Sequence, residues 1–402
     1  MTSVDVVLSA TDVASARAAG VRDLGVARID IFESIAAAAP AWDRLAASAI
    51  ATPFGRRDWI ELWQQHVGPH GRVRPLIAVA RDARDEPLFL LPLACRTGRL
   101  FTVAHYFGGR HSQLNMGLWR PDVAAALTAA DLRATFETIA QRCGIDLFLL
   151  LNQPTTWDGR RNPLAQLAHQ PSPDNVFSVD FAGECGEQVI KSRIKGTLRG
   201  LLKSKEKKLA KLADYRYFRA TTPDEAERLL LAFLAQKAAH LKAQGVRNSF
   251  ADPGIADFLH AACVDALASG DPVIELHAIE GDGEVLAVMG GVANPQRFSC
   301  MFNSYTLTEH ARWSPGLVLI QHMLRHCADR GIGSYDLGAG FAPYKRYFCK
   351  TTDQLFDGVL AFTERGHIAA AMCRIGLAGK RWIKSTGPLW AVVRAVRRMT
   401  SR

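Results

Sequence analysis

The chain lacks the features that define several protein classes. It has no run of 18 or more uncharged apolar residues, so no segment is predicted to span a membrane as a helix. Its first residues include the acidic Asp5 and no basic stretch, which argues against a secretory signal peptide. The eight cysteines are scattered without a C-x-x-C pair. We therefore expect reduced core thiols and no structural zinc site.

Common catalytic signatures are missing as well. The chain contains no G-x-S-x-G elbow, no Walker loop and no recognisable Ser/Cys-His triad. His322 and His326 are four residues apart on one predicted helix, but no third ligand and no H-E-x-x-H pattern accompany them. We therefore predict no metal and no tightly bound cofactor.

What the chain does have is length for two domains and an uneven charge. Its 402 residues exceed one ordinary domain, and 48% apolar with 22% charged residues is typical of globular proteins. Of the net charge of +10, Lys191–Lys211 supplies nine basic residues against one acid, and Arg365–Arg402 supplies nine against none. This pattern indicates an acidic body with two basic elements that would meet an anionic partner surface.

Loop composition and periodicity divide the chain into segments. Asn152–Asn175, rich in Pro, Gln, Asn and Gly, is the clearest boundary. The predicted parts are a lead-in over 1–28, an N-terminal domain over 29–175, a second domain over 176–365 and a basic amphipathic segment over 366–402. A single basic helix over 189–212 is predicted within the second domain.

Strands and one apolar helix are predicted along the second domain. The antiparallel strands are Val273–Glu280, Glu284–Val292 and Arg297–Thr306. The hairpin turn Gly281-Asp282-Gly283 joins the first two strands. The helix Leu317–Cys327 follows, then a strand Ser334–Leu337, and Gly358–Thr363 is expected to be the last strand of this domain.

The helix begins at a Ser-Pro-Gly step. Ser314 suits an N-cap, and Pro315 fits the first helical position, where a missing N–H costs nothing. The exposed N–H groups of such a start, including Gly316, form a site for an anion such as a pyrophosphate. Arg312, just before it, is positioned to pair with a phosphate. The alternative is an ordinary helix cap beside a solvated arginine.

This order of elements resembles the GNAT acyltransferase superfamily. The Ser-Pro-Gly helix is followed by a strand ending in Asp336-Leu337-Gly338-Ala339-Gly340 and then by Tyr344-Lys345-Arg346-Tyr347-Phe348. The resemblance is greatest to the group with CelD-like cellulose-biosynthesis proteins, FemX-like aminoacyl ligases and bacterial ceramide synthases. It extends from about Phe233 to Phe362 and is weaker upstream. The usual Gln/Arg-x-x-Gly-x-Gly/Ala signature is absent, and Arg312–Gly316 stands in its place.

The resemblance implies an α/β (α+β) fold of two tandem GNAT-like domains, each with a mixed, mostly antiparallel sheet flanked by helices. It also implies acyl transfer from a thioester to an amine, with acyl-CoA as co-substrate. In GNAT-like folds one strand presents backbone N–H groups to the thioester, and the resemblance places Met289, Gly290 and Gly291 there. The alternative for the two glycines is a bulge required by packing.

The aromatic-lysine motif supplies further site candidates. In FemX-like ligases the matching lysine is associated with the transfer centre, and Lys345 occupies its position, next to Tyr344. Asp336 is a carboxylate on an apolar strand, which indicates a role near the site or an ion pair with Lys345. For Lys345 the alternative is a structural salt bridge.

Two further groups are candidates for proton transfer, which amide formation requires. Glu275 and His277 alternate along one strand, so both could face a cleft and act as a base, or lie on the solvated face of the sheet. Tyr305 and Tyr347 are candidate acids for the thiolate, with a core or rim position as the alternative.

The favoured function is an acyl-CoA-dependent N-acyltransferase that forms an amide on a membrane lipid amine, such as a sphingoid base. The alternatives are an acetyltransferase of cellulose or exopolysaccharide biosynthesis, a FemX-like ligase that uses aminoacyl-tRNA, and an inactive scaffold. The segments 191–211 and 365–402 are predicted to contact an anionic membrane, which places the protein in the cytoplasm on the inner face of the cytoplasmic membrane. Nucleic acid is the less favoured partner. For 365–402 the alternative is a helix docked on its own domain.

Overall fold

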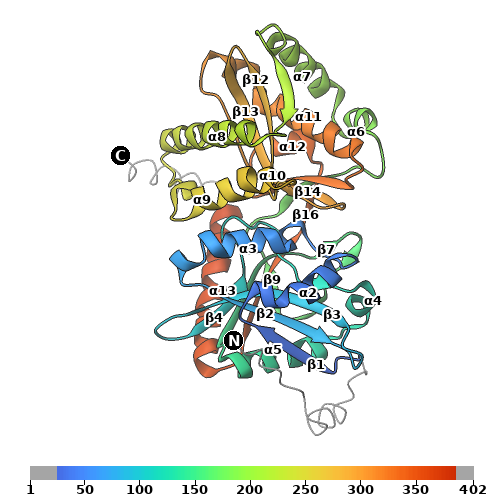
Figure 1. Cartoon of the computed structure of the whole chain (residues 1–402), viewed down its shortest axis with the longest axis vertical. Coiled ribbons are helices and arrows are strands. Elements are labelled where there is room, and N and C mark those ends of the chain that lie inside the picture. Colours follow the sequence, from blue (N-terminus) through green and yellow to red (C-terminus); the bar gives the residue numbers. More distant parts are fainter. Residues whose placement is uncertain (1–24, 386–402) are drawn as a thin grey trace. The chain divides into compact units, whose positions relative to one another are not determined.

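The computed structural model describes residues 25–385, which form two compact units (Figure 1). Unit 1 comprises the described residues up to Pro173 together with Gln354–Trp382. Unit 2 comprises Asp174–Asp353 and the described residues after Trp382. Most of the predicted lead-in, and the chain from 386 onward, lie outside the described residues. Each unit is a sheet with flanking helices, and the predicted fold class is confirmed.

Unit 1 is built on an eight-stranded sheet with the order β1-β2-β3-β4-β6-β17-β9, and β5 pairs with β3. All neighbours are antiparallel except β4 and β6. The strands are β1 (Arg28–Phe32), β2 (Arg74–Arg81), β3 (Pro87–Thr97), β4 (Thr102–Tyr106), β5 (Leu118–Trp119), β6 (Leu147–Pro154), β9 (His169–Pro171) and β17 (Leu355–Ala361), with β7 (Thr156–Trp157) and β8 (Arg160–Arg161) as a separate hairpin.

The helices of unit 1 bury one apolar face each. They are α2 (Ile35–Ala46), α3 (Arg57–His66), α4 (Pro121–Ala126), α5 (Ala129–Cys143) and α13 (Glu364–Ser385). Trp59 and Trp63, four residues apart on α3, are both buried, so they share the inner face of this helix. The helices α4 and α5 are separate, since α5 has its own start at Thr128. There the Thr128 hydroxyl and the Asp131 carboxylate form a capping box.

The last strand of the chain belongs to unit 1, which corrects the predicted second domain. β17 lies between β6 and β9, with Leu360 opposite Phe148 and Phe356 opposite Pro171. The carboxylate of Asp357 is buried and accepts the N–H of Asn152 at 2.9 Å. The predicted boundary at 365 is therefore wrong, because β17 completes the sheet of the first unit.

The helix α13 covers part of this same sheet. Ala369 and Ala370 are buried in a small core with Leu147 and Val359, and Leu377 packs against its edge. The start of the basic C-terminal segment is thus docked on its own unit, as the alternative interpretation stated. Among residues 25–385, no helix is long and apolar enough to cross the bilayer.

Unit 2 is built on a seven-stranded sheet with the order β11-β12-β13-β14-β15-β10-β16. Again one pair alone, β14 and β15, is parallel in this described sheet. The strands are β10 (Val176–Asp180), β11 (Arg216–Arg219), β12 (Glu275–Gly281), β13 (Glu284–Ala293), β14 (Arg297–Tyr305), β15 (Ser334–Ala339) and β16 (Thr351–Asp353). The predicted hairpin between β12 and β13 is confirmed, with Asp282 and Gly283 at positive φ.

The helices of unit 2 are α6 (Gly186–Arg193), α7 (Gly196–Leu209), α8 (Pro223–Gln244), α9 (Ile255–His260), α10 (Ala266–Ala268), α11 (Pro315–Asp329) and α12 (Lys345–Phe348). The single basic helix predicted over 189–212 is wrong. Ile194 and Lys195 take extended backbone angles between α6 and α7. Burial of Ile194 in the core accounts for the break, because the chain turns there to place this side chain inside.

The helices α8 and α11 cover opposite faces of the sheet. Phe302 of β14 stacks on Phe233 of α8, with ring centroids 4.2 Å apart. Its partner across the ladder is Gly290, whose neighbour Met289 points the other way, into the core that contains Val318 of α11. The site described below lies on the α11 face.

Parallel pairing between β14 and β15 is short. It joins Arg297–Ser299 to Ser334–Asp336, and the ladder ends there although β14 continues to Tyr305. The two strands therefore diverge. The end of β14, from Asn303 onward, lies beside the start of α11 instead of beside β15.

Candidate active site

A cavity of about 270 Å³ lies between the end of β14 and the start of α11. One wall is apolar, and the rim carries polar groups. The apolar lining comes from Val288, Met289, Leu317, Leu319 and Ile320, and the polar groups come from Asn303, Ser304, Tyr305, Ser314 and Tyr344. An apolar cleft with a few converging polar groups is the usual form of a small-molecule site.

The start of α11 opens onto this cavity. Ser314 precedes the helix and Pro315 is its first residue, as predicted. The predicted side-chain cap is wrong, however, because Ser314 adopts a left-handed backbone at φ 51° and its hydroxyl does not bond the helix. Gly316 packs beneath the ring of Tyr305, where an added Cβ would be 3.5 Å from the ring. The helix start thus directs its dipole toward the cavity, as an anion site requires.

Tyr344 is the best-placed proton donor in the cavity. The side-chain amide of Asn303 donates to its hydroxyl oxygen at 3.3 Å, so the Tyr344 proton is left for another acceptor. Burial raises the pKa of Tyr344 to about 12. The hydroxyl is therefore protonated at neutral pH. Sequence reasoning identified Tyr344 but missed Asn303, whose importance depends on where β14 and β15 separate.

Tyr305 lies at the rim with a histidine behind it. Its side chain is 44% exposed, and its ring lies 4.5 Å from that of His240 on α8. Nδ1 of His240 is 2.9 Å from the carbonyl oxygen of Gln236, which fixes the tautomer with the proton on Nδ1. Nε2 then carries a lone pair and has no hydrogen-bond partner within residues 25–385. Because this nitrogen is buried and His240 does not line the cavity, His240 supports the ring of Tyr305 from the α8 side.

A second basic group of α8 lies one turn earlier. Lys237 is half-buried, and its ammonium donates to the carbonyl oxygen of Asn303 at 3.1 Å. Burial lowers the pKa of Lys237, and none of the described carboxylates forms an ion pair with it. A lysine and a histidine three positions apart share one helix face. The sequence shows the spacing of Lys237 and His240, but it does not show that they face β14.

Gly290 and Gly291 are accounted for by aromatic packing. A Cβ at Gly290 would lie 2.2 Å from the ring of Phe302, and one at Gly291 would lie 2.5 Å from the ring of Phe298. β13 is also an inner strand, with β12 on one side and β14 on the other. The register of β13 with β14 shifts between Gly290 and Gly291, and this bulge beside the two aromatic rings favours the packing alternative over a thioester contact. Met289 alone of the three lines the cavity.

Lys345 holds the loop that follows β15. Its buried ammonium donates to the carbonyl oxygens of Gly338, Ala339 and Gly340 at 2.9, 3.1 and 2.9 Å. Burial lowers the pKa of Lys345. No ion pair joins it to Asp336 or to any other carboxylate that the structure describes. The structure gives Lys345 a role in shaping the loop that carries Tyr344.

Asp336 is buried on β15 but does not line the cavity. Its carboxylate accepts the hydroxyl of Ser299 at 2.6 Å and the N–H of Gly338 at 2.8 Å. Burial raises the pKa of Asp336. These bonds join β14 to β15 at the last residue before the strands diverge, so Asp336 fixes the base of the cleft. Tyr347, in contrast, is 51% exposed.

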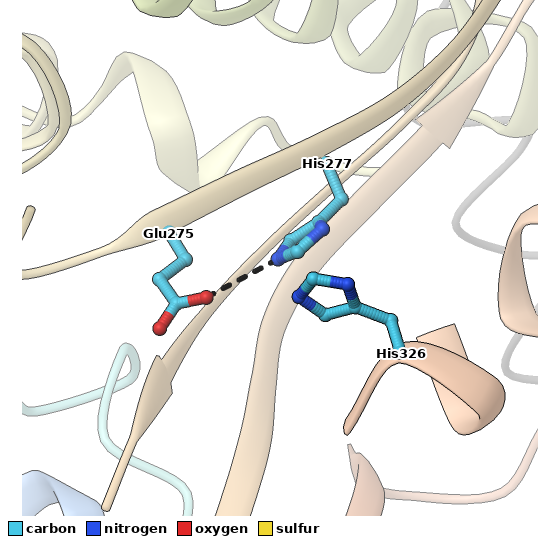
Figure 2. A group of neighbouring side chains, drawn as sticks. All are labelled: Glu275, His277 and His326. Carbon is cyan, nitrogen blue, oxygen red and sulfur yellow. Dashed lines mark hydrogen bonds and ion pairs between the residues drawn. The ribbon is translucent and has the colours of Figure 1, made fainter. Parts of the chain in front are cut away.

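Glu275 and His277 face the opposite end of α11, and Figure 2 shows them beside His326. Both lie on one face of β12, as predicted, but they are buried, and neither lines the cavity. Oxygen and nitrogen atoms of the three residues lie within 4.8 Å of one another, which is a possible metal-ligand set. The Glu275 carboxylate, however, already accepts two bonds from Arg330 and lies 3.4 Å from Arg219. Two guanidinium groups at the carboxylate oppose a cation.

The protonation of this group follows from the same contacts. Burial alone would raise the pKa of Glu275, but the bonds from His277 and Arg330 hold it well below the ordinary value. Burial lowers the pKa of His277, and it lowers that of His326 to about 4. Glu275 is thus ionised and both histidines are neutral at pH 7. The group is an arginine-paired carboxylate that ties β12 to α11.

Arg312 is exposed, and its side chain contacts two neighbouring residues at the protein surface. Its guanidinium lies over the ring of Trp313 and 3.4 Å from Glu309. Its carbonyl oxygen accepts a bond from Lys205, so α7 runs beside the loop that leads into α11. Five exposed lysines on α7 and at its two ends form no ion pair with described residues: Lys203, Lys207 and Lys208 on the helix, Lys195 just before it and Lys211 just after it. This cationic face borders the approach to the helix start.

Comparison with known proteins agrees with this geometry. Residues 197–346 match the family of the acetyltransferase (GNAT) domain. Comparison with curated protein sequences gives no match. The matched segment begins with α7 and ends within α12, and it includes every residue that lines the cavity.

Solved structures share the fold over most of the chain. One is a conserved protein of unknown function from Bacteroides thetaiotaomicron, with 13% identity and a TM-score of 0.51, covering 83% of this chain and 100% of that one. Another is FemX, with 9% identity and a TM-score of 0.53, covering 74% of this chain and 91% of that one. At such identities the likeness shows the fold alone. Residues 197–346 thus match the acetyltransferase (GNAT) domain, and this match supports an acyltransferase.

Proposed function

We propose that unit 2 transfers an acyl group from acyl-CoA to a primary amine. The observation that carries this proposal is the cavity at the start of α11, in which an apolar wall, a helix start and the Asn303–Tyr344 pair meet. The apolar wall suits an acyl chain. The helix start suits the pyrophosphate of CoA, and the lysines of α7 suit its remaining phosphate charge.

The chemistry follows from the groups at the rim. The amine nitrogen bonds to the thioester carbon, an oxyanion forms, and the carbon–sulfur bond then breaks to give the amide and the thiolate. The Tyr344 hydroxyl supplies the proton that the thiolate needs, since its raised pKa keeps it protonated. The proton that the amine loses passes to solvent at the rim of the cavity, where Tyr305 is exposed. Lys237 lends positive charge near the end of β14.

For the acceptor we propose a membrane lipid amine, such as a sphingoid base, which would give a ceramide-type product. Two basic segments, 191–211 and 365–402, support an acceptor held at an anionic membrane, with the protein peripheral on the inner face of the cytoplasmic membrane. An acetyltransferase of cellulose or exopolysaccharide biosynthesis would instead acylate a sugar.

The test is an amide-formation assay with purified protein. Acyl-CoA thioesters of several chain lengths are combined with a long-chain amine, an amino sugar or a soluble short amine, and product is identified by mass spectrometry alongside thiol release. We expect amide with the long-chain amine, and Tyr344→Phe should lower kcat by about 10²- to 10⁴-fold because the proton donor is lost. Tyr347→Phe, at an exposed tyrosine three residues on, is the matched control and should be neutral. Thiol release without amide from any amine would overturn the proposal.

One observation favours a second candidate, an aminoacyl-tRNA donor. The lysine face of α7 is long enough to contact several phosphates, as a nucleic acid would require. Treatment of the assay with ribonuclease separates the two donors. Activity with purified acyl-CoA should survive ribonuclease, whereas a tRNA-dependent ligase would be inactive without added charged tRNA.

A further inference from the structure

The helix α13 has a second apolar face, on the side away from its sheet. Ile368, Met372 and Ile375 are 65%, 57% and 73% exposed, although their neighbours Ala369 and Ala370 are buried against unit 1. The spacing i, i+4, i+7 puts the three side chains in one row, and Trp382, 62% exposed, extends it by two turns. We call this row the outer stripe of α13. Apolar side chains in such a row are rare on a free surface.

The charge around the outer stripe limits what can cover it. After Glu364 the chain has no further acidic residue, and nine basic residues follow. Lys380 on α13 is exposed and forms no ion pair with a described residue, whereas Arg365 lies 3.4 Å from the carboxylate of Asp146. A second copy of the same helix would bring two cationic surfaces together, and the remaining chain after Ser385 is itself cationic. Self-association and folding back of that segment are both opposed by charge.

We propose that the outer stripe of α13 is the surface by which unit 1 lies on an anionic membrane. The row of apolar side chains would enter the boundary between headgroups and acyl chains, while Lys380 would meet anionic headgroups. The inner face stays docked on β17, so the helix lies along the surface and does not span it. This inference deepens the proposed lipid acceptor, but the binding itself requires no catalysis.

The test measures sedimentation of the full chain with vesicles. Wild type should bind vesicles of phosphatidylcholine with phosphatidylglycerol, and should bind pure phosphatidylcholine much more weakly. Replacing Ile368, Met372 and Ile375 together by Ser should lower the partition coefficient by at least about tenfold, because three apolar side chains no longer leave water. The matched control replaces Leu100, Leu231 and Val246, also exposed, by Ser and should bind as wild type does.

Three outcomes overturn the proposal. The first is wild-type protein that stays in the supernatant with anionic vesicles, and the second is a stripe variant that sediments as wild type does. The third is a wild-type dimer in sedimentation velocity that the stripe variant abolishes, which would assign the stripe to self-association. Amide formation on a soluble short amine is measured in parallel. A stripe variant that keeps this activity but loses vesicle binding separates failure of docking from failure of catalysis.

Discussion

Lys345 donates to three carbonyl oxygens of one loop, so its removal takes a hydrogen bond from each of these buried or half-buried acceptors. We expect Lys345→Met to lower the free energy of unfolding of unit 2 by about 2–4 kcal/mol, given about 1–3 kcal/mol for a buried acceptor left unsatisfied. The loop that carries Tyr344 would shift, and amide formation should fall together with stability. Urea unfolding and the amide assay, both at one temperature, check this.

The comparison variant for Lys345 is Lys350→Met, which removes an exposed ammonium from the same region. It should change stability by less than about 0.5 kcal/mol. If Lys345→Met abolished activity while the unfolding curve stayed that of wild type, the lysine would act on the substrate and not on the loop.

His326 should make the protein sensitive to acid. Burial lowers the pKa of His326 from an ordinary 6.5 to about 4, with His277, Arg330 and Arg219 adding to the effect and Glu275 opposing it. Between these values the unfolded chain binds a proton that the folded chain does not, so stability falls as the pH drops from 6.5 to 4. The contribution is on the order of 1 kcal/mol, since solvent screens this half-buried group.

His326→Phe should therefore flatten the fall in Tm between pH 7 and pH 4.5, because it removes the group that titrates. His70→Phe, at an exposed position, serves as the reference and should leave the fall in Tm as it is in wild type. An unchanged slope in the His326 variant would mean that other groups account for the acid sensitivity.

Site residues that belong to a local sequence motif could be predicted. Site residues that tertiary packing brings to the cavity could not. The sequence pointed to Tyr344 and to the Ser-Pro-Gly step, since each belongs to a local pattern, and both line the cavity. Asn303 belongs to no pattern. It lines the cavity because β14 leaves β15 after Ser299, and that divergence depends on contacts between segments far apart in the sequence.

At the scale of elements, the exposed lysines of α7 should act on donor binding. Lys203, Lys207 and Lys208 all lie on α7 and are exposed, and the first two are four residues apart. Replacing all three by Glu should raise KM for acyl-CoA by about tenfold and leave kcat nearly unchanged, because steering of an anionic donor is lost while the cavity stays intact. The effect should shrink as salt is raised.

The charge-matched control for α7 replaces Arg133, Lys242 and Lys350, all exposed, by Glu. Both triple variants change the net charge by the same amount. If the position of the lysines determines donor binding, and not the total charge, KM for acyl-CoA in this control should stay within about twofold of wild type. If the two triple variants raised KM equally, α7 would have no specific role in donor binding.

Helix boundaries show where local signals suffice. The helix α8 (Pro223–Gln244) begins and ends at local signals, because Thr222 caps its start and Gly245 takes the left-handed backbone at its end. The break within 189–212 has one weak local signal, Gly196, which is the first residue of α7. There the burial of Ile194 interrupts a helix that periodicity alone would continue.

At the scale of the whole molecule, unit 1 depends on the last part of the chain. A chain that ends at Asp353 would lack β17 and α13, so β6 would lose its antiparallel partner and Leu147 its cover. We expect this truncation to abolish hydrogen-exchange protection in β6, while the central strands β12 to β14 of unit 2 keep theirs.

The segment 174–353 expressed alone supplies the complementary measurement. It contains every strand of the seven-stranded sheet and should unfold in one cooperative transition. Retained protection of β6 in the truncated chain would show that unit 1 is complete without its last strand.

The sequence could not predict which of the two sheets β17 joins, and the reason is physical. Its residues predict a strand whichever sheet it joins, and nearest neighbours in sequence usually pair. The pairing with β6 and β9 is decided by contacts such as Asp357 with Asn152, across about 200 residues. The two-unit fold was predictable, whereas the route of the chain between the units was not.

That route also sets an order for biosynthesis. As the ribosome advances from the N-terminus, β1 to β9 emerge first, yet the strand that belongs between β6 and β9 is translated only after all of unit 2. At 5 to 20 residues per second the delay is about 10–40 s, longer than most single domains need to fold. The second half of the nascent chain can therefore reach its native state first, and the N-terminal half waits with an open sheet edge, a natural client for a chaperone that shields unpaired strands.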